Sequence, residues 1–177
     1  TPGEPGVGST GLYSAVLTAS KQPFVPAVSG NRLSRYGNLY YLFGKGGTPA
    51  CAAAARLYGV IETAAPNHCL LNGPVTLAPN SSQSAIRAAL TPGLPAGVTI
   101  SQGQILEVPQ GTVVLQAVPS SFASPPKPAA PNTQFFVLKD DIALRGTDIT
   151  NPQQSTDTGG NPDVSFGFTS TGTTEFQ

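Results

Sequence analysis

One stretch indicates the class of this fold: Tyr40-Tyr-Leu-Phe-Gly-Lys-Gly-Gly-Thr-Pro49-Ala-Cys-Ala-Ala-Ala-Ala-Arg-Leu-Tyr-Gly59. Its first four residues are aromatic or apolar and contain no breaker, which predicts a strand. The glycines that follow indicate a turn. Thr48 is a favoured N-cap, Pro49 suits the first helical position, and Gly59 is typical of the residue just past a helix end. The stretch therefore predicts a strand, a turn and a helix over 49–58.

Short helices and strands are expected on both sides of this stretch. A helix from about 11 to 20, capped by Thr10, has apolar residues at helical spacing. A second helix, from about 82 to 90, follows the capping residues Asn80-Ser-Ser-Gln. Strands are expected at 105–108, 112–118, 134–138 and 164–168, the first two joined as a hairpin across Pro109-Gln-Gly111. Helices and strands mix without a regular alternation, which predicts an α+β fold.

The last part of the chain differs from the rest in charge. Residues 1–138 carry seven basic and three acidic side chains, whereas residues 139–177 carry two basic and six acidic ones. The break follows a stretch at 119–131 with five prolines, which predicts an extended loop. Beyond it, Val164, Phe166 and Phe168 alternate along a strand, a pattern typical of one buried face. We therefore expect two segments with different surroundings.

Composition excludes several classes of protein. The 177 residues include 20 glycines, 18 prolines and only 10 % charged residues, with no net charge. A coiled coil would be rich in charged helix formers and poor in proline, and a nucleic-acid binder would carry a basic surface. No apolar run is long enough to cross a bilayer, and the first ten residues do not resemble a signal peptide. Because methionine is absent even at position 1, we expect a mature product or a piece of a longer chain.

Candidate catalytic chemistry is sparse. His68, the single histidine, is adjacent to Cys69, and sequence neighbours rarely face each other as nucleophile and base. Cys51, His68 and Cys69 do not have the spacing of a zinc site. Asp140 and Asp141 have no identifiable acid–base partner, so we expect solvated turn carboxylates. The sequence therefore predicts no catalytic residue, no metal site and no cofactor.

The two cysteines, Cys51 and Cys69, favour a disulfide. They are the only cysteines in the chain, so pairing leaves no odd thiol. A bridge would join the alanine-rich helix to the segment around Cys69. Two buried free thiols are the alternative, because bridges form only in an oxidising compartment.

Two glycine-rich loops resemble ligand-binding motifs only in part. Gly44-Lys-Gly-Gly-Thr48 lacks the spacing of a phosphate-binding loop, so a turn explains it better. Asp157-Thr-Gly-Gly-Asn161-Pro-Asp163 has oxygen ligands at alternate positions, as calcium loops do, but lacks the central glycine in register and the closing Glu. A turn before the 164–168 strand is the expected structure there.

A resemblance to a known family rests on the residues of the C-terminal part. Leu144-Arg-Gly-Thr-Asp-Ile149, Gly160-Asn-Pro-Asp-Val-Ser-Phe-Gly-Phe168 and Gly172…Phe176 resemble three successive motifs of SecD, the protein-export subunit. The front of the chain is similar to the actinobacterial form of SecD at Leu12-Tyr-Ser-Ala-Val16, at Tyr40–Phe43 and at Val108-Pro-Gln-Gly-Thr-Val-Val114. Residues 48–98 carry no matching motif.

The resemblance implies a particular architecture. The chain would be the first large extracytoplasmic domain of SecD, between its first two membrane spans. That domain has an irregular head lobe of short helices and β-hairpins, followed by strands returning into a ferredoxin-like base. Residues 1–134 would form the head lobe, with the Pro-rich loop 119–131 inside it. Residues 135–177 would be the return segment into an incomplete base.

The resemblance also implies a function. The SecD domain, at the extracytoplasmic face of the bacterial cell membrane, assists protein translocation by transiently holding the emerging unfolded preprotein. Its partners would be preprotein segments and, in the full-length RND-family membrane protein, SecF and the Sec channel. Neither nucleic acid nor catalysis is implied for this soluble part. Four aromatic residues are the candidate contacts with preprotein, with core packing as the alternative: Tyr40, Tyr41, Phe43 and Tyr58.

A second class of protein has the same low charge, Gly/Thr/Ser-rich turns and cysteine pair. It is a stand-alone secreted adhesion or carbohydrate-binding module. Architecture separates the two, because such a module is expected to be an all-β sandwich without the three helices predicted above.

Overall fold

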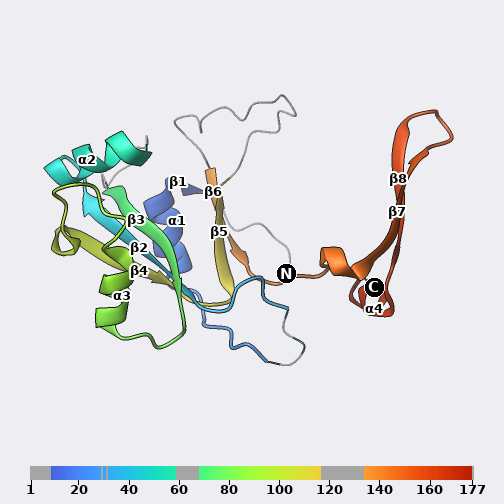
Figure 1. The fold of residues 1–177 in the computed structure, drawn as a ribbon, viewed down its shortest axis with the longest axis horizontal. Coiled ribbons are helices and arrows are strands. Elements are labelled where there is room, and N and C mark those ends of the chain that lie inside the picture. Colours follow the sequence, from blue (N-terminus) through green and yellow to red (C-terminus); the bar gives the residue numbers. More distant parts are fainter. Residues whose placement is uncertain (1–8, 29, 31, 59–67, 117–133, 177) are drawn as a thin grey trace. The chain divides into compact units, whose positions relative to one another are not determined.

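A computed structural model of the chain describes residues 9–28, 30, 32–58, 68–116 and 134–176. They fall into two units: residues 1–28 and 35–140 form unit 1, and residues 29–34 and 141–177 form unit 2 (Figure 1). Residues 29–34 of unit 2 thus interrupt unit 1, and the last boundary between the units comes after Asp140. The Pro-rich loop predicted at 119–131 lies outside the described residues. No helix among the described residues is long and apolar enough to cross a membrane.

Unit 1 is built around the strand β2 (Asn38–Lys45). It pairs in antiparallel fashion with β3 (His68–Leu77) on one side and with β4 (Gly103–Val108) on the other. All residues of β2 before Lys45 are buried, which explains the uninterrupted aromatic and apolar run. The predicted strand at 40–43 is confirmed and extends in both directions.

Helices cover both faces of this sheet. Tyr40 and Leu42 lie in one core cluster with residues of α2 (Pro49–Tyr58) and α3 (Gln83–Leu90). Tyr41 and Phe43 lie in a second cluster with residues of α1 (Leu12–Ala19). Successive strand residues point to opposite faces, so one strand supplies both cores.

Capping explains where two of the three α-helices of unit 1 begin. The Thr48 hydroxyl accepts a hydrogen bond from the Cys51 N–H at 3.4 Å, and the Ser82 hydroxyl accepts one from the Ala85 N–H at 3.2 Å. Both helices are confirmed, as is the helix expected near 11–20. The cap predicted for that helix at Thr10 is wrong, because Thr10 belongs to strand β1 (Ser9–Thr10) and Gly11 is the N-cap.

A second sheet of unit 1 has the order β1-β6-β5, with β5 at Thr112–Gln116 and β6 at Gln134–Lys139. The hairpin predicted between 105–108 and 112–118 is therefore wrong: β4 pairs with β2, and β5 pairs with β6. The buried Gln110 explains the change of sheet. Its side chain accepts from the Gly37 N–H at 2.7 Å and donates to the Val25 carbonyl at 2.9 Å, which holds the connection away from a hairpin path.

One further element belongs to unit 1. The 3-10 turn η1 (Ile100–Gln102) leads into β4. The strand β3 was not predicted, because Gly73 and Pro74 interrupt the run of residues that favour a strand.

Unit 2 is a β-hairpin with short helical turns. It contains η2 (Gly146–Asp148), β7 (Ile149–Thr156), β8 (Pro162–Phe168) and α4 (Ser170–Phe176). β7 and β8 pair with each other in antiparallel fashion. The buried face predicted for β8 is wrong: Val164 is 59 % and Phe166 is 50 % exposed. A two-stranded hairpin has no second layer that covers a whole face, and α4 packs on part of β8. Both units mix helices and antiparallel strands, so the α+β class is confirmed.

Candidate functional site

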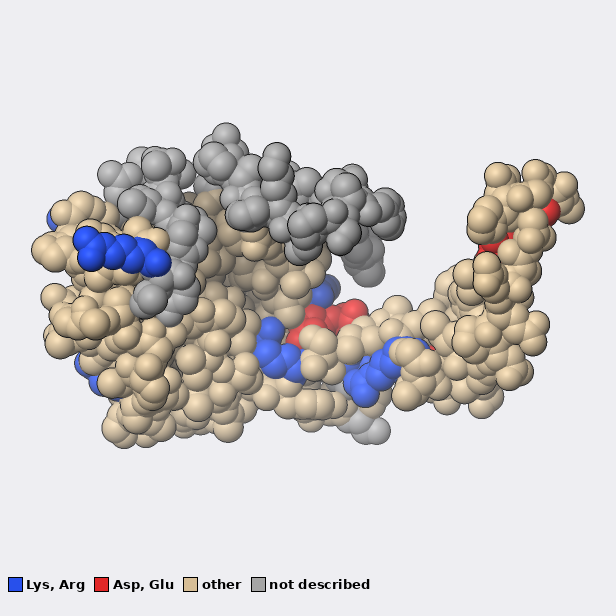
Figure 2. Space-filling model, turned by 45° about the horizontal axis from the view of Figure 1, so that its top comes forward, with Lys and Arg blue, Asp and Glu red and all other residues tan. Residues whose placement is uncertain are grey.

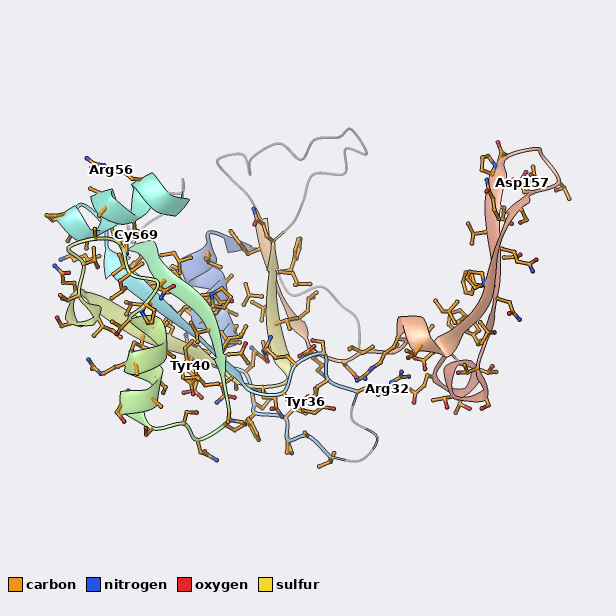
Figure 3. All side chains as sticks on the ribbon, in the orientation of Figure 1. Arg32, Tyr36, Tyr40, Arg56, Cys69 and Asp157 are labelled. Carbon is orange, nitrogen blue, oxygen red and sulfur yellow. A yellow bond between two sulfur atoms is a disulfide. The ribbon has the colours of Figure 1, made fainter. Side chains whose placement is uncertain are left out.

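Three of the four aromatic residues considered for partner contact are core residues. Tyr40, Tyr41 and Phe43 are each no more than 3 % exposed. Figure 3 labels Tyr40 among the side chains of unit 1. Burial raises the pKa of the Tyr41 phenol, against the opposing effect of Arg35. These side chains cannot meet a partner in this structure, because the two faces of β2 are covered by helices. The side chain of Tyr58 lies outside the described residues.

Cys51 and Cys69 form a disulfide. Their Cα atoms are 5.6 Å apart, and the bridge joins α2 to β3. Both cysteines are buried, at 4 % and 1 % exposure. The alternative of two free thiols is therefore not what the structure contains.

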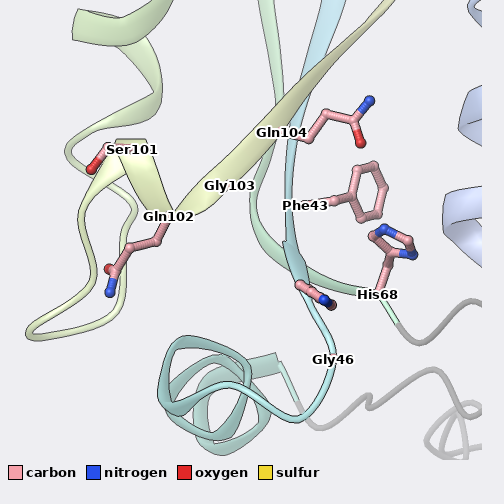
Figure 4. Close-up of a pocket in the computed structure, with 8 residues that line it drawn as sticks. Phe43, Gly46, His68, Ser101, Gln102, Gly103 and Gln104 are labelled. Atoms are coloured by element: carbon pink, nitrogen blue, oxygen red, sulfur yellow. The ribbon is translucent and has the colours of Figure 1, made fainter.

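A pocket of about 480 Å³ opens at the end of the central sheet (Figure 4). It is lined by Phe43, Lys45, Gly46 and His68 from β2, β3 and the turn after β2, and by residues 101–104 from η1 and β4. Lys45 and His68 are direct cross-strand partners. The sequence did not single out this site, because its polar residues come from three separate segments.

Helix α1 supplies a side wall beside this pocket. The Tyr13 ring stacks on the His68 ring with centroids 3.7 Å apart, and it meets the Phe43 ring edge-on at 5.1 Å. The Tyr13 hydroxyl donates to Gln104 Oε1 at 3.2 Å. These contacts hold an aromatic wall and the Gln104 amide in place together.

The opposite wall is held by a capping box. Gln102 Oε1 accepts from the Thr99 N–H at 2.7 Å, while the Ser101 and Thr99 hydroxyls share a hydrogen bond of 3.0 Å. Both glutamines of the pocket thus use their amide oxygens inside the protein. Their amide nitrogens, together with the Lys45 ammonium group, make the described lining rich in hydrogen-bond donors.

The residues that carry the family resemblance gather around Asp148 in unit 2. Its buried carboxylate accepts from the Arg145 N–H at 2.6 Å and forms an ion pair with Arg32. The hydrogen bond from Arg145 and the contact with Arg32 lower the pKa of the Asp148 carboxyl. The Asp148 carbonyl accepts from the Thr169 N–H at 2.9 Å, so η2 is tied to the start of α4.

Aromatic residues of the same motifs stack at the exposed end of β8. The Phe168 and Phe176 ring centroids are 4.9 Å apart, and Phe166 meets Phe168 edge-on at 5.5 Å. Phe166 and Phe176 are nonetheless at least half exposed. The stack therefore leaves apolar area on the surface of unit 2.

The loop considered for calcium is a self-contained turn. Asp157 Oδ1 accepts from the backbone N–H groups of Gly159 and Asn161, each at 2.8 Å, and its Oδ2 accepts from the Asn161 amide at 3.0 Å. Asn161 thereby lowers the pKa of Asp157. Across the described residues, no group of three or more His, Cys, Asp or Glu side chains could hold a metal ion. The turn expected here is confirmed.

The expectation for Asp140 as a solvated turn carboxylate is wrong. Asp140 is 4 % exposed and accepts from the Arg35 N–H at 3.2 Å. Its own N–H donates to the Gly111 carbonyl at 2.9 Å. The residue fastens the end of β6 to the turn between β4 and β5, whereas Asp141 is exposed.

Comparisons with family models, with curated proteins and with solved structures each gave no match to this chain.

Proposed function

We propose that this chain is the first large extracytoplasmic domain of a SecD-type protein-export subunit, and that it transiently holds unfolded preprotein segments. The packing around Asp148 carries the proposal. The three C-terminal motifs are separate in sequence, yet Gly172 lies against Asp148 and Phe168, and the Phe168 ring stacks on the Phe176 ring in unit 2. Contacts between residues of all three motifs are expected if the motifs together specify one structural unit.

Two other features support the proposal. A disulfide such as Cys51–Cys69 persists in an oxidising compartment, which agrees with an extracytoplasmic domain. The surface carries few charges: most of the face in Figure 2 is tan, with charged groups in small separate clusters. A surface that accepts many different chains should not present one strong field or a precise polar code.

In this proposal residues 1–134 form the head lobe, which takes in most of unit 1, and residues 135–177 form the return segment into the base. Unit 2, with its β7–β8 hairpin and α4, corresponds to part of a ferredoxin-like base. The partners are unfolded secretory segments and, in the parent membrane protein, SecF and the Sec channel. The exposed Val164 and Phe166 are the kind of surface that further base strands would cover.

Binding of an unfolded preprotein tests the proposal. The amide NMR spectrum of the chain is recorded while a secretory protein, kept unfolded by substitution, is added at rising concentration. We expect progressive shifts at a defined set of amides, and the folded form of the same protein serves as the control. A spectrum unchanged by the unfolded protein at high concentration contradicts the proposal. The encoding gene offers a second test, since a SecD subunit must encode membrane spans on both sides of this domain.

The alternative, a secreted adhesion module, required an all-β sandwich. The helices α1, α2 and α3 all pack on the central sheet of unit 1. The α+β class thus removes the structural argument for that alternative.

A further inference from the structure

We propose that the pocket at the end of the central sheet binds a carboxylate carried by an extended polypeptide that pairs with the edge of β4. This inference rests on the proposed function, because it specifies which segments of an unfolded chain unit 1 prefers. The carboxylate would come from a Glu or Asp side chain.

The edge of β4 is the first observation. The sheet order is β3-β2-β4, so among the described strands β4 has β2 as its one neighbour. β4 contains no proline, and its one charged residue is Glu107. An edge strand of this kind presents N–H and C=O groups to an added strand, and such pairing tolerates many sequences because it uses the main chain.

The position of the pocket is the second observation. Gly103 and Gln104 are the first residues of β4 and also line the pocket. A segment laid along β4 would therefore extend over the pocket. The close-up in Figure 4 shows Gln104, Phe43 and His68 grouped together and Ser101 and Gln102 on the far side of Gly103, with the Ser101 and Gln102 side chains directed away from that group.

The polarity of the pocket selects the ligand. Tyr13 and Thr99 occupy the amide oxygens of Gln104 and Gln102, so each glutamine keeps amide N–H groups to donate. The exposed Lys45 adds a positive charge, and the described lining contains no Asp or Glu. A carboxylate, which only accepts hydrogen bonds when ionised, complements this set of donors.

The test compares two short blocked peptides of alternating Thr and Val with one central residue, Glu in one and Gln in the other. Binding to the 177-residue chain is measured by NMR titration at low salt. We expect the Glu peptide to bind about 3- to 5-fold more tightly, the range of a partly exposed charge pair. The preference should shrink as salt is added.

Three variants locate the preference. Lys45→Gln should abolish it, while Lys21→Gln, which removes an exposed lysine outside the pocket lining, should leave it intact. Gln104→Glu keeps an oxygen for the Tyr13 hydroxyl but replaces the donor with a charge, so it should reverse the preference. The amide spectra of the unbound variants show whether each one folds.

Each outcome decides a separate point. Equal binding of both peptides, or a preference that survives Lys45→Gln, overturns the carboxylate pocket and leaves the proposed function standing. Free glutarate that binds as tightly as the Glu peptide overturns the polypeptide as the occupant. If the unfolded preprotein also fails to bind, the proposed function fails with it.

Discussion

Gly172 lies against Asp148: a Cβ added to Gly172 would stand 2.7 Å from the Asp148 carbonyl oxygen and 3.0 Å from the Asp148 Cβ. The absence of a side chain at residue 172 therefore lets α4 approach η2. This close approach accounts physically for the glycine in the third motif of the family resemblance.

Gly172→Ala should loosen the packing of α4 on η2. Either the helix or the backbone at Asp148 must shift, at a cost of about 1–3 kcal/mol for an overpacked site. The Thr169 N–H, which donates to the Asp148 carbonyl, should then exchange faster with solvent. Gly146→Ala is the matched control, because a Cβ there meets nothing within 4 Å. Unchanged exchange at Thr169 in the Gly172 variant would show that the approach is not tight in solution.

Acid should weaken unit 2 through Asp148. Its pKa is lower in the folded protein, so its contribution to stability is present above the pKa of the unfolded chain. That contribution is lost as pH falls through the lowered folded pKa. In Asp148→Asn the urea midpoint followed at unit 2 amides should fall at pH 7 and depend less on acid pH. Asp157 also has a lowered pKa, so some acid sensitivity should remain. The exposed Asp141→Asn is the control, and an equal response of both variants would refute the role of Asp148.

Removing the disulfide should destabilise unit 1. In the chain-entropy model a bridge closing a loop of this length contributes about 3 kcal/mol, because it restricts the unfolded chain. Urea unfolding of the Cys51→Ala/Cys69→Ala double variant, followed at unit 1 amides, measures the loss. Titration of the untreated protein should find no reactive thiol, and two after reduction under denaturing conditions. Two thiols without reductant would contradict the bridge.

Gln110→Ala should destabilise the connection between β4 and β5. The buried side-chain amide of Gln110 bonds Gly37 and Val25, and its loss leaves the buried Gly37 N–H and the partly buried Val25 C=O without this partner. A cost of about 1–3 kcal/mol for each such group is typical. Gln116→Ala removes an exposed glutamine at the end of β5 and should change the unfolding free energy little. If the two variants unfold at the same urea concentration, Gln110 does not determine the connection.

Local signals were enough to predict much of this fold. The helices α2 and α3 carry their caps, Thr48 and Ser82, beside them in sequence. The path of the chain after Val108 could not be predicted, because it depends on bonds from Gln110 to residues 73 and 85 positions away. The exposure of Phe166 could not be predicted either, because the alternation of apolar residues along a strand does not reveal whether a second layer covers that strand.

The candidate site was less predictable than the fold. Its aromatic wall and its donors depend on the contact of Tyr13 with Gln104, across 91 positions, and on the pairing of Lys45 with His68. The aromatic residues conspicuous in the sequence, Tyr40 and Tyr41, are core residues because β2 is covered on both faces. Among the candidate residues, only the pairing of the two cysteines could be predicted from composition alone.

The Cys51–Cys69 bridge turns the polypeptide between the two cysteines into a closed covalent ring. One protease cut inside that ring opens it without separating the two parts of the chain. Such a nicked molecule would keep its full mass plus one water until a reductant releases two fragments. After a single cut in this segment, the two parts of the chain therefore stay covalently joined for as long as the bridge stays oxidised.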